Sequence, residues 1–228
     1  MCGGMEASRL DALLARGEDL LSRMGAAPHA AAEDAVRELV AAYARPERGY
    51  HDLRHLAEIL DRVDELAGSA THPDLVRLAA WYHDAVHTAA TRPGQDEEAS
   101  ARMAQDRLAA LGVSPATRRE VSRLVRLTAA HDPAPDDPDG AVLCDADLAV
   151  LARDRAGYAD YVAGVRQEYR NVPDTEFRVG RAAVLRALVA RPNLFSTDDG
   201  RARWEETART NVTAELAELT ELTEQAEP

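Results

Sequence analysis

Residues 74–89 read DLVRLAAWYHDAVHTA and combine a helical run of apolar side chains with His83, Asp84 and His87. The two histidines stand four residues apart, so one face of a helix presents both imidazoles. Asp84 follows His83 among apolar neighbours, and a carboxylate placed there is costly unless it is paired or binds a metal. This segment therefore predicts a helix at or near the core that carries a candidate metal site.

Helix-forming residues dominate the rest of the chain. Alanine, leucine, arginine and glutamate favour helices, and no run of alternating β-branched residues is long enough for a strand. We expect about ten helices, at residues 8–24, 31–44, 52–67, 74–89, 96–111, 115–130, 142–153, 156–170, 176–190 and 203–224. Proline in the first turn, serine as a cap and glycine after the last turn mark helix ends, as at Pro73, Ser114, Pro115 and Gly112. The segments 131–140 and 191–200 contain proline and glycine and are expected to be surface loops.

The length predicts one domain. A chain of 228 residues fits a single domain of ordinary size, and a helical domain of this length buries a core without disulfides. No repeat of 20–50 residues and no long linker is visible. We therefore expect an all-α bundle over residues 1–228, with a metal-site core at about 48–155 and helices 156–225 packed on it.

Charge and composition exclude several classes of protein. The formal net charge of −13 disfavours binding to the phosphate backbone of nucleic acids. All 27 basic residues are arginine. The absence of lysine excludes a Walker A lysine, a Schiff-base lysine, the strand lysine of kinases and a Ser-Lys dyad.

The remaining composition favours a cytoplasmic protein without a membrane partner. Cys2 and Cys144 do not form a disulfide framework or a zinc-type array. The first residues lack the basic and apolar regions of a signal peptide. The longest apolar stretch of note, residues 78–82, is far shorter than the roughly 20 residues needed to span a bilayer.

Two further segments carry candidate ligands. His51 and His55, in YHDLRH, repeat the spacing of four that places two imidazoles on one helix face. In LCDADLAVL, Asp147 stands at helical spacing with large aliphatic residues and therefore needs a cation. Asp145 lies about 200° away around an α-helix. We therefore favour Asp147 over Asp145 as the ligand from this segment.

The order of these residues resembles the HD superfamily of metal-dependent phosphohydrolases. A histidine leads an amphipathic helix, a His-Asp pair follows 28 residues later, and an Asp-Leu pair comes later still. The residues that match the four metal ligands of the superfamily are His55, His83, Asp84 and Asp147. Over residues 48–216 the chain also resembles a bacterial branch of predicted HD phosphohydrolases, through RGYHDLRHL, AAWYHDAV, DEEASA, LCDADLAVL, YVAGVRQEY and FRVGRAAVLRAL.

The resemblance implies an all-α enzyme that hydrolyses the phosphate ester of a small phosphorylated metabolite, such as a nucleotide. It also implies a divalent metal ion, either Mn, Mg, Co, Ni, Zn or Fe. Two imidazoles and two carboxylates leave positions open on a six-coordinate ion for a water and a phosphoryl oxygen. The ion acidifies the water that attacks phosphorus and neutralises the charge that develops there.

Several other residues are candidates for contact with the substrate. Arginine must supply the remaining positive charge because lysine is absent, and its planar fork suits phosphate. We expect Arg54, Arg166 and Arg181 to contribute. His51 is a further substrate-binding candidate, or else a donor behind the ligands or a cap of the helix start.

Three residues are candidates for proton transfer. His87 stands where some nucleotidases of the superfamily carry a glutamate that acts as acid or base. It can take the same role, or it can bind a second ion. Glu97, in DEEASA, and Asp145 are further carboxylates for catalysis. We interpret His29 and His72 as structural and expect His131, which leads a loop rich in proline and aspartate, to lie at the surface.

Two other functions stay open. The first is a dinuclear HD enzyme, either a phosphodiesterase or a diiron oxygenase of the inositol-oxygenase kind. Such enzymes generally have two more histidines on separate helices, whereas here only His87 and His131 lie between Asp84 and Asp147. The second is a catalytically silent HD domain used for binding or scaffolding. Apart from the substrate, the partner considered is a second copy of the chain in a homodimer.

Overall fold

The computed structural model describes residues 2–89, 92 and 94–224. Within these residues every regular element is a helix, as the composition predicts. The α-helices are α1 (Cys2–Arg23), α2 (His29–Tyr43), α3 (Leu53–Glu65), α4 (Pro73–Tyr82), α5 (Gln95–Ala110), α6 (Pro115–Leu127), α7 (Pro138–Leu148), α8 (Arg155–Glu168), α9 (Asp174–Val189) and α10 (Asp198–Glu224). Two short 3-10 helices, η1 (Ala67–Ser69) and η2 (Ala149–Ala152), follow α3 and α7.

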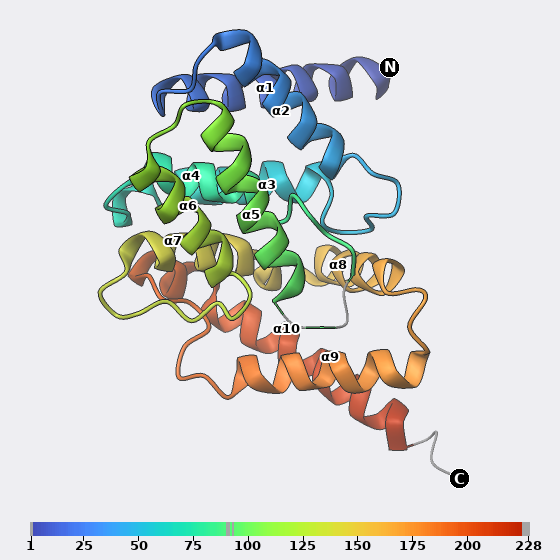
Figure 1. Cartoon of the computed structure of the whole chain (residues 1–228). Coiled ribbons are helices and arrows are strands. Elements are labelled where there is room, and N and C mark those ends of the chain that lie inside the picture. The colour runs from blue at the N-terminus through green and yellow to red at the C-terminus, as the bar shows by residue number, and fades with distance from the viewer. Residues whose placement is uncertain (1, 90–91, 93, 225–228) are drawn as a thin grey trace.

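The helices are arranged in tiers along the molecule (Figure 1). α1 and α2 lie at one end, α9 and α10 lie at the other, and the remaining helices lie between them. The core is formed by large side chains that are fully buried, among them Tyr43, Leu60, Trp81, Tyr82 and Phe195. α4 runs through this core, and its residues from Leu78 to Tyr82 are almost completely buried. None of the described helices is both long and apolar enough to span a membrane.

The local signals at helix ends are confirmed. Pro73 and Pro115 occupy the first turns of α4 and α6. The Ser114 hydroxyl accepts a hydrogen bond of 3.2 Å from the backbone N–H of Thr117 and caps α6. Gly112 follows α5 with a φ of +74°, a left-handed conformation that glycine adopts without a steric penalty.

The helix expected at residues 74–89 is shorter than predicted. α4 ends at Tyr82, and residues 83–86 form turns. Side chains from other elements bond to the backbone here. The Ser100 hydroxyl accepts from the N–H of Val86 at 3.0 Å and donates to its carbonyl at 3.1 Å. The Tyr43 hydroxyl accepts from the N–H of Asp84 at 3.2 Å. These bonds replace those of a continued helix, so His83 and His87 do not share one.

The two expected loops are also shorter than predicted. α7 begins at Pro138, inside the expected loop 131–140, because Asp137 accepts the N–H of Gly140 at 3.0 Å and caps the helix. The backbone N–H groups in the first turn of a helix have no partner within the helix, so a proline there, which lacks an N–H, loses no hydrogen bond. α10 begins at Asp198, inside the expected loop 191–200, and aspartates occupy its first turn. These residues therefore start helices rather than prevent them.

Candidate metal centre

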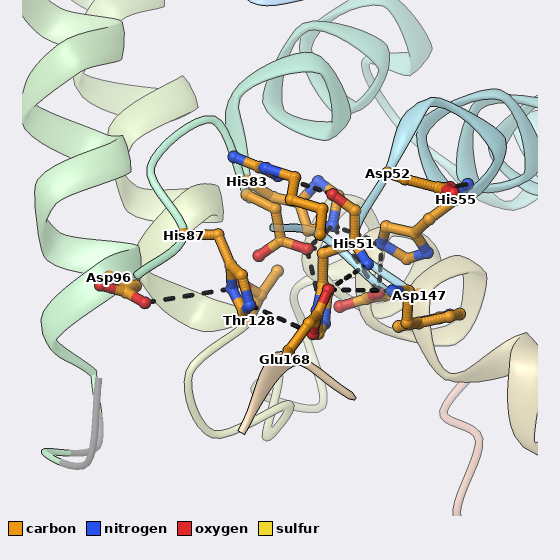
Figure 2. Close-up of polar contacts among 12 residues, drawn as sticks. His51, Asp52, His55, His83, His87, Asp96, Thr128, Asp147 and Glu168 are labelled. Carbon is orange, nitrogen blue, oxygen red and sulfur yellow. Dashed lines mark hydrogen bonds and ion pairs between the residues drawn. The ribbon is translucent and has the colours of Figure 1, made fainter. Parts of the chain in front are cut away.

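The four residues predicted as metal ligands meet at one place. His55 lies in the first turn of α3, His83 and Asp84 directly follow α4, and Asp147 lies near the end of α7. The two histidines are only 3% and 1% exposed. Figure 2 shows the labelled side chains of His55, His83 and Asp147 converging from separate segments.

The distances between their donor atoms match those between ligands of one ion. The Nε2 atoms of His55 and His83 are 2.9 Å apart. Asp84 Oδ2 lies 3.0 Å from His83 Nε2 and 3.4 Å from His55 Nε2. Asp147 Oδ1 lies 3.4 Å and 3.7 Å from the same two nitrogen atoms. Ligands bound at about 2.1 Å are about 3.0 Å apart when they meet at a right angle and about 3.4 Å apart in a tetrahedron. His55, His83 and Asp84 therefore form a group that could hold a metal ion, and Asp147 Oδ1 lies close to both imidazoles.

Local hydrogen bonds fix the positions of both imidazoles. Asp52 caps α3 and accepts the N–H of His55 at 3.2 Å, which fixes the first turn. Nδ1 of His83 lies 2.8 Å from the carbonyl oxygen of Ala80. Since a carbonyl only accepts, Nδ1 carries the proton of the neutral ring, and the lone pair of Nε2 faces the cluster.

The charges of the cluster favour a cation. Burial lowers the pKa of His83, but the carboxylates of Asp84 and Asp147 outweigh this effect and raise it to about 9. Burial dominates at His55 and lowers its pKa. Burial raises the pKa of Asp147, but the hydrogen bond from His131 and the charge of His83 lower it to about 2. For Asp84, the effect of burial is outweighed by His83 and other histidines, which hold its pKa well below the usual range. Both carboxylates are therefore ionised at neutral pH.

A second group, formed by His51, His87 and Glu168, adjoins the first. Glu168 Oε2 lies 2.7 Å from Nδ1 of His51 and 3.2 Å from Nε2 of His87. Nε2 of His51 lies 3.9 Å from Asp84 Oδ2. His51 therefore stands between Glu168 and the four-residue cluster.

Glu168, at the end of α8, binds the turn that precedes α3. Its Oε1 atom accepts backbone N–H groups from Gly49 at 3.0 Å and from Tyr50 and His51 at 2.9 Å each. Burial raises the pKa of Glu168, but the bonds from His51 and His87 lower it below its usual range. Burial lowers the pKa of His51, but Asp84 and Glu168 outweigh it and raise that pKa.

Two glycines let α8 approach this turn closely. A Cβ atom on Gly49 would lie 2.4 Å from the carbonyl oxygen of Gly164, and one on Gly164 would lie 2.7 Å from the carbonyl oxygen of Gly49. Neither distance is tolerated, so only glycine fits at either position. Glu168 lies one helical turn after Gly164 on α8. The close approach of the two glycines therefore brings its carboxylate to residues 49–51.

Arg48 and Tyr43 connect the segments of the site. Like Glu168, they were not predicted from the sequence. Buried Arg48 donates to the carbonyl of His51 at 2.7 Å and to that of Ala85 at 3.0 Å. Tyr43 donates to the carbonyl of Trp81 at 3.3 Å. Only Glu168 has a signal in the sequence, because it stands at helical spacing after buried Tyr161 and Val165.

Asp145, expected to be catalytic, is not brought to the cluster. It is fully buried and accepts the N–H groups of Ser196 and Thr197 at 2.7 Å and 2.8 Å and the Thr197 hydroxyl at 2.7 Å. It therefore ties α7 to the segment before α10. Asp147 faces the cluster and Asp145 faces away, in agreement with their angular separation on the helix.

The three candidate arginines have other partners. Arg54 is 80% exposed and pairs with Asp52 at 3.1 Å, although with His55 it lines a pocket of about 130 Å³. Arg166 binds the carbonyls of Tyr169 and Val172 and the carboxylate of Asp174. Arg181 forms a buried ion pair with Glu215 at 2.7 Å. Arg166 and Arg181 therefore stabilise the helices that surround the site.

The acidic residue beside His87 is Asp96 rather than Glu97. Asp96 Oδ2 lies 3.9 Å from Nδ1 of His87, and Asp96 accepts both the N–H and the hydroxyl of Thr88 at 2.7 Å. Among the described residues, no ion pair or hydrogen bond joins Glu97 to the site. Glu97 occupies the next position on α5, about 100° further around the helix than Asp96.

His131 does not lie free at the surface, contrary to expectation. Its Nε2 atom lies 2.8 Å from Oδ2 of Asp147, and its side chain is only 21% exposed. The proline-rich composition of the segment predicts only a loop and gives no sign of this contact. The contact forms because α7 begins within the segment and carries Asp147 to His131.

Comparisons of the chain with family models, with curated proteins and with solved structures found no match.

Proposed function

We propose that the chain is a divalent-metal-dependent phosphohydrolase that acts on a small phosphorylated metabolite such as a nucleotide. The observation that carries the proposal is the convergence of two imidazoles and two carboxylates, with nitrogen–oxygen separations of 3.0–3.7 Å. The order of these residues along the chain, which resembles the HD superfamily, supports a phosphate ester as the substrate.

His55, His83, Asp84 and Asp147 are the residues that would hold the ion. Two nitrogen and two oxygen donors suit Mn, Fe, Co, Ni or Zn, and they leave positions open in a six-coordinate Mn or Mg site. When bound, such an ion acidifies a water molecule and stabilises the charge that develops on a phosphoryl group.

We expect His51 and His87 to bind the phosphoryl group and to transfer protons. Nδ1 of His51 donates to Glu168, so its Nε2 faces the cluster and can hold a proton toward a substrate oxygen. His87 reaches Glu168 from the other side, and the centres of the two rings are 4.3 Å apart. Because Arg166 and Arg181 bind elsewhere, His51 and His87 take their place as the substrate-binding groups beside the ion.

Metal analysis and a phosphatase screen test the proposal. The protein, loaded in turn with Mn²⁺, Mg²⁺, Co²⁺, Ni²⁺ and Zn²⁺, is assayed on nucleotides, sugar phosphates and dinucleotides. We expect about one ion per chain, given one set of ligands. His83→Ala and Asp84→Ala should lose the ion and the activity together, while His29→Ala, at an exposed histidine, should lose neither. A metal-free protein that cannot be loaded and is fully stable would contradict the proposal.

His87→Ala separates the mononuclear enzyme from a dinuclear one. As a proton-transfer residue, His87 can be removed without loss of metal, and kcat should fall by about 10²–10⁴-fold. The dinuclear alternative is favoured by the group of His51, His87 and Glu168, whose candidate ligand atoms all lie within 4.8 Å of one another. In that case the protein should hold two ions and His87→Ala should halve the metal content. An iron spectrum would indicate an oxygenase. Metal binding without any activity would indicate a silent domain.

A further inference from the structure

Asp147 divides its two carboxylate oxygens between two partners. Oδ1 faces the cluster, 3.4 Å from Nε2 of His55, and Oδ2 lies 2.8 Å from Nε2 of His131. A carboxylate oxygen accepts hydrogen bonds, so Nε2 of His131 is the donor of this bond.

The backbone of His131 adopts a conformation that a residue with a side chain rarely takes. Its φ is +48°, in the left-handed region where Cβ crowds the following carbonyl. Three hydrogen bonds hold it there. The N–H of His131 donates to the carbonyl of Leu127 at 2.9 Å. Arg191, just after α9, donates to the carbonyls of His131 and Ala130 at 2.6 Å each. Such over-determined strain is typical of functional sites.

Arg191 is itself held by the C-terminal helices. The guanidinium of Arg209, on α10, donates to the backbone carbonyl of Arg191 at 2.8 Å. A chain of contacts therefore runs from α10 through Arg191 to His131 and ends on a candidate metal ligand. The bond to Leu127 is local and closes the turn that follows α6, whereas the bonds from Arg191 come from a segment about 60 residues away.

We propose that His131 is a positioning residue of the metal centre, which holds Asp147 by Oδ2 so that Oδ1 alone is presented to the ion. Arg191 sets the position of His131. The inference rests on the metal site of the proposed function but not on the reaction that the site performs. A ligand whose second oxygen is bonded is fixed in orientation and cannot rotate to bind the ion with both oxygens.

Metal affinity in the full chain tests this role. Titration with Mn²⁺ by calorimetry should show a Kd about 10–100-fold weaker in His131→Ala, the usual effect of removing a partner of a metal ligand. Arg191→Met should weaken binding in the same direction. His131→Gln keeps an N–H donor and should recover most of the affinity. The matched control is His72→Ala, which removes a similar bond between a histidine and an aspartate, 2.9 Å from His72 Nδ1 to Asp139, at the far end of α4 from His83.

The absorption spectrum of Co²⁺-loaded protein is a second readout, because it depends on the number of ligand atoms. His131→Ala should change the spectrum and His72→Ala should not. Wild-type affinity and spectrum in His131→Ala, with the ion lost in Asp147→Ala, would overturn the positioning role and leave the proposed function intact. Weakened Mn²⁺ binding in a protein that hydrolyses no phosphate ester would support the role while refuting the hydrolase. A wild-type chain that binds no metal would refute both.

Discussion

Replacing Glu168 with alanine should destabilise the protein more than any substitution of an exposed glutamate. The carboxylate is 1% exposed and accepts three consecutive backbone N–H groups and one imidazole N–H. Its removal leaves these donors without partners in the interior, at about 1–3 kcal/mol for each one that water does not reach. Removing one partner of a buried charged network typically costs about 3–5 kcal/mol. We therefore expect a loss of about 4 kcal/mol in the free energy of unfolding, or about 8–16 °C in Tm for a chain of this size.

Glu168→Gln distinguishes the contributions that the two carboxylate oxygens of Glu168 make to stability. The amide oxygen can still accept the three N–H groups at Oε1, while the amide nitrogen replaces Oε2 and faces Nδ1 of His51. The imidazole must then change its tautomer, and we expect a smaller loss of about 1–2 kcal/mol.

Urea denaturation followed by circular dichroism measures both variants. The control is Glu205→Ala, because Glu205 also accepts backbone N–H groups, from Leu194 and Phe195, but is 18% exposed. Water can replace it, so its loss should cost about 1–2 kcal/mol. If Glu168→Ala were no less stable than Glu205→Ala, the bonds of Glu168 would contribute little and the reasoning would be refuted.

Three further substitutions test other parts of the structure. Asp145→Asn should keep the metal and lose about 2–3 kcal/mol of stability, whereas Asp147→Asn should lose the metal, and elemental analysis showing the reverse would mean that the ligand is misassigned. Asp52→Ala removes the cap of α3 and should cost about 1 kcal/mol in urea denaturation; an unchanged midpoint would show that the cap is not needed. Arg181→Met leaves the buried Glu215 carboxylate without its positively charged partner and should cost about 3–5 kcal/mol. The added substitution Glu215→Leu should recover most of that loss, and a double variant as unstable as Arg181→Met would contradict this account.

Residue patterns along the chain predict the helices well, and the four residues that they single out as candidate ligands come together in the structure. Helix formation depends on local propensity and capping, so signals such as Ser114 and Pro115 mark α6 correctly. The ligands are visible because ionisable side chains such as Asp147 interrupt apolar helix faces. The same helical phase places Asp145 away from the cluster, where it bonds to residues 196–197.

Contacts between distant segments explain what the sequence does not reveal. α4 stops at Tyr82 because hydroxyl groups of Tyr43 and Ser100 bond to the residues that follow. Glu168 meets the turn at residues 49–51 from 117–119 residues away. His131 reaches Asp147 from a backbone φ of +48°, and the donor to its carbonyl is Arg191, 60 residues further along the chain. Helical periodicity carries no information about such pairs.

The contact between Gly49 and Gly164 gives the site a signature that can be sought in other chains. Because each glycine excludes a side chain on the other, the two positions constrain each other even though they are far apart in the sequence. The sequence Gly-Tyr-His at residues 49–51 must then pair with a later Gly-x-x-x-Glu, here residues 164–168. A chain that has the His-Asp pair but carries a larger residue at either glycine would have to hold its histidines in another way. This pairing therefore offers a criterion, independent of the metal ligands, for deciding which other proteins build the same site.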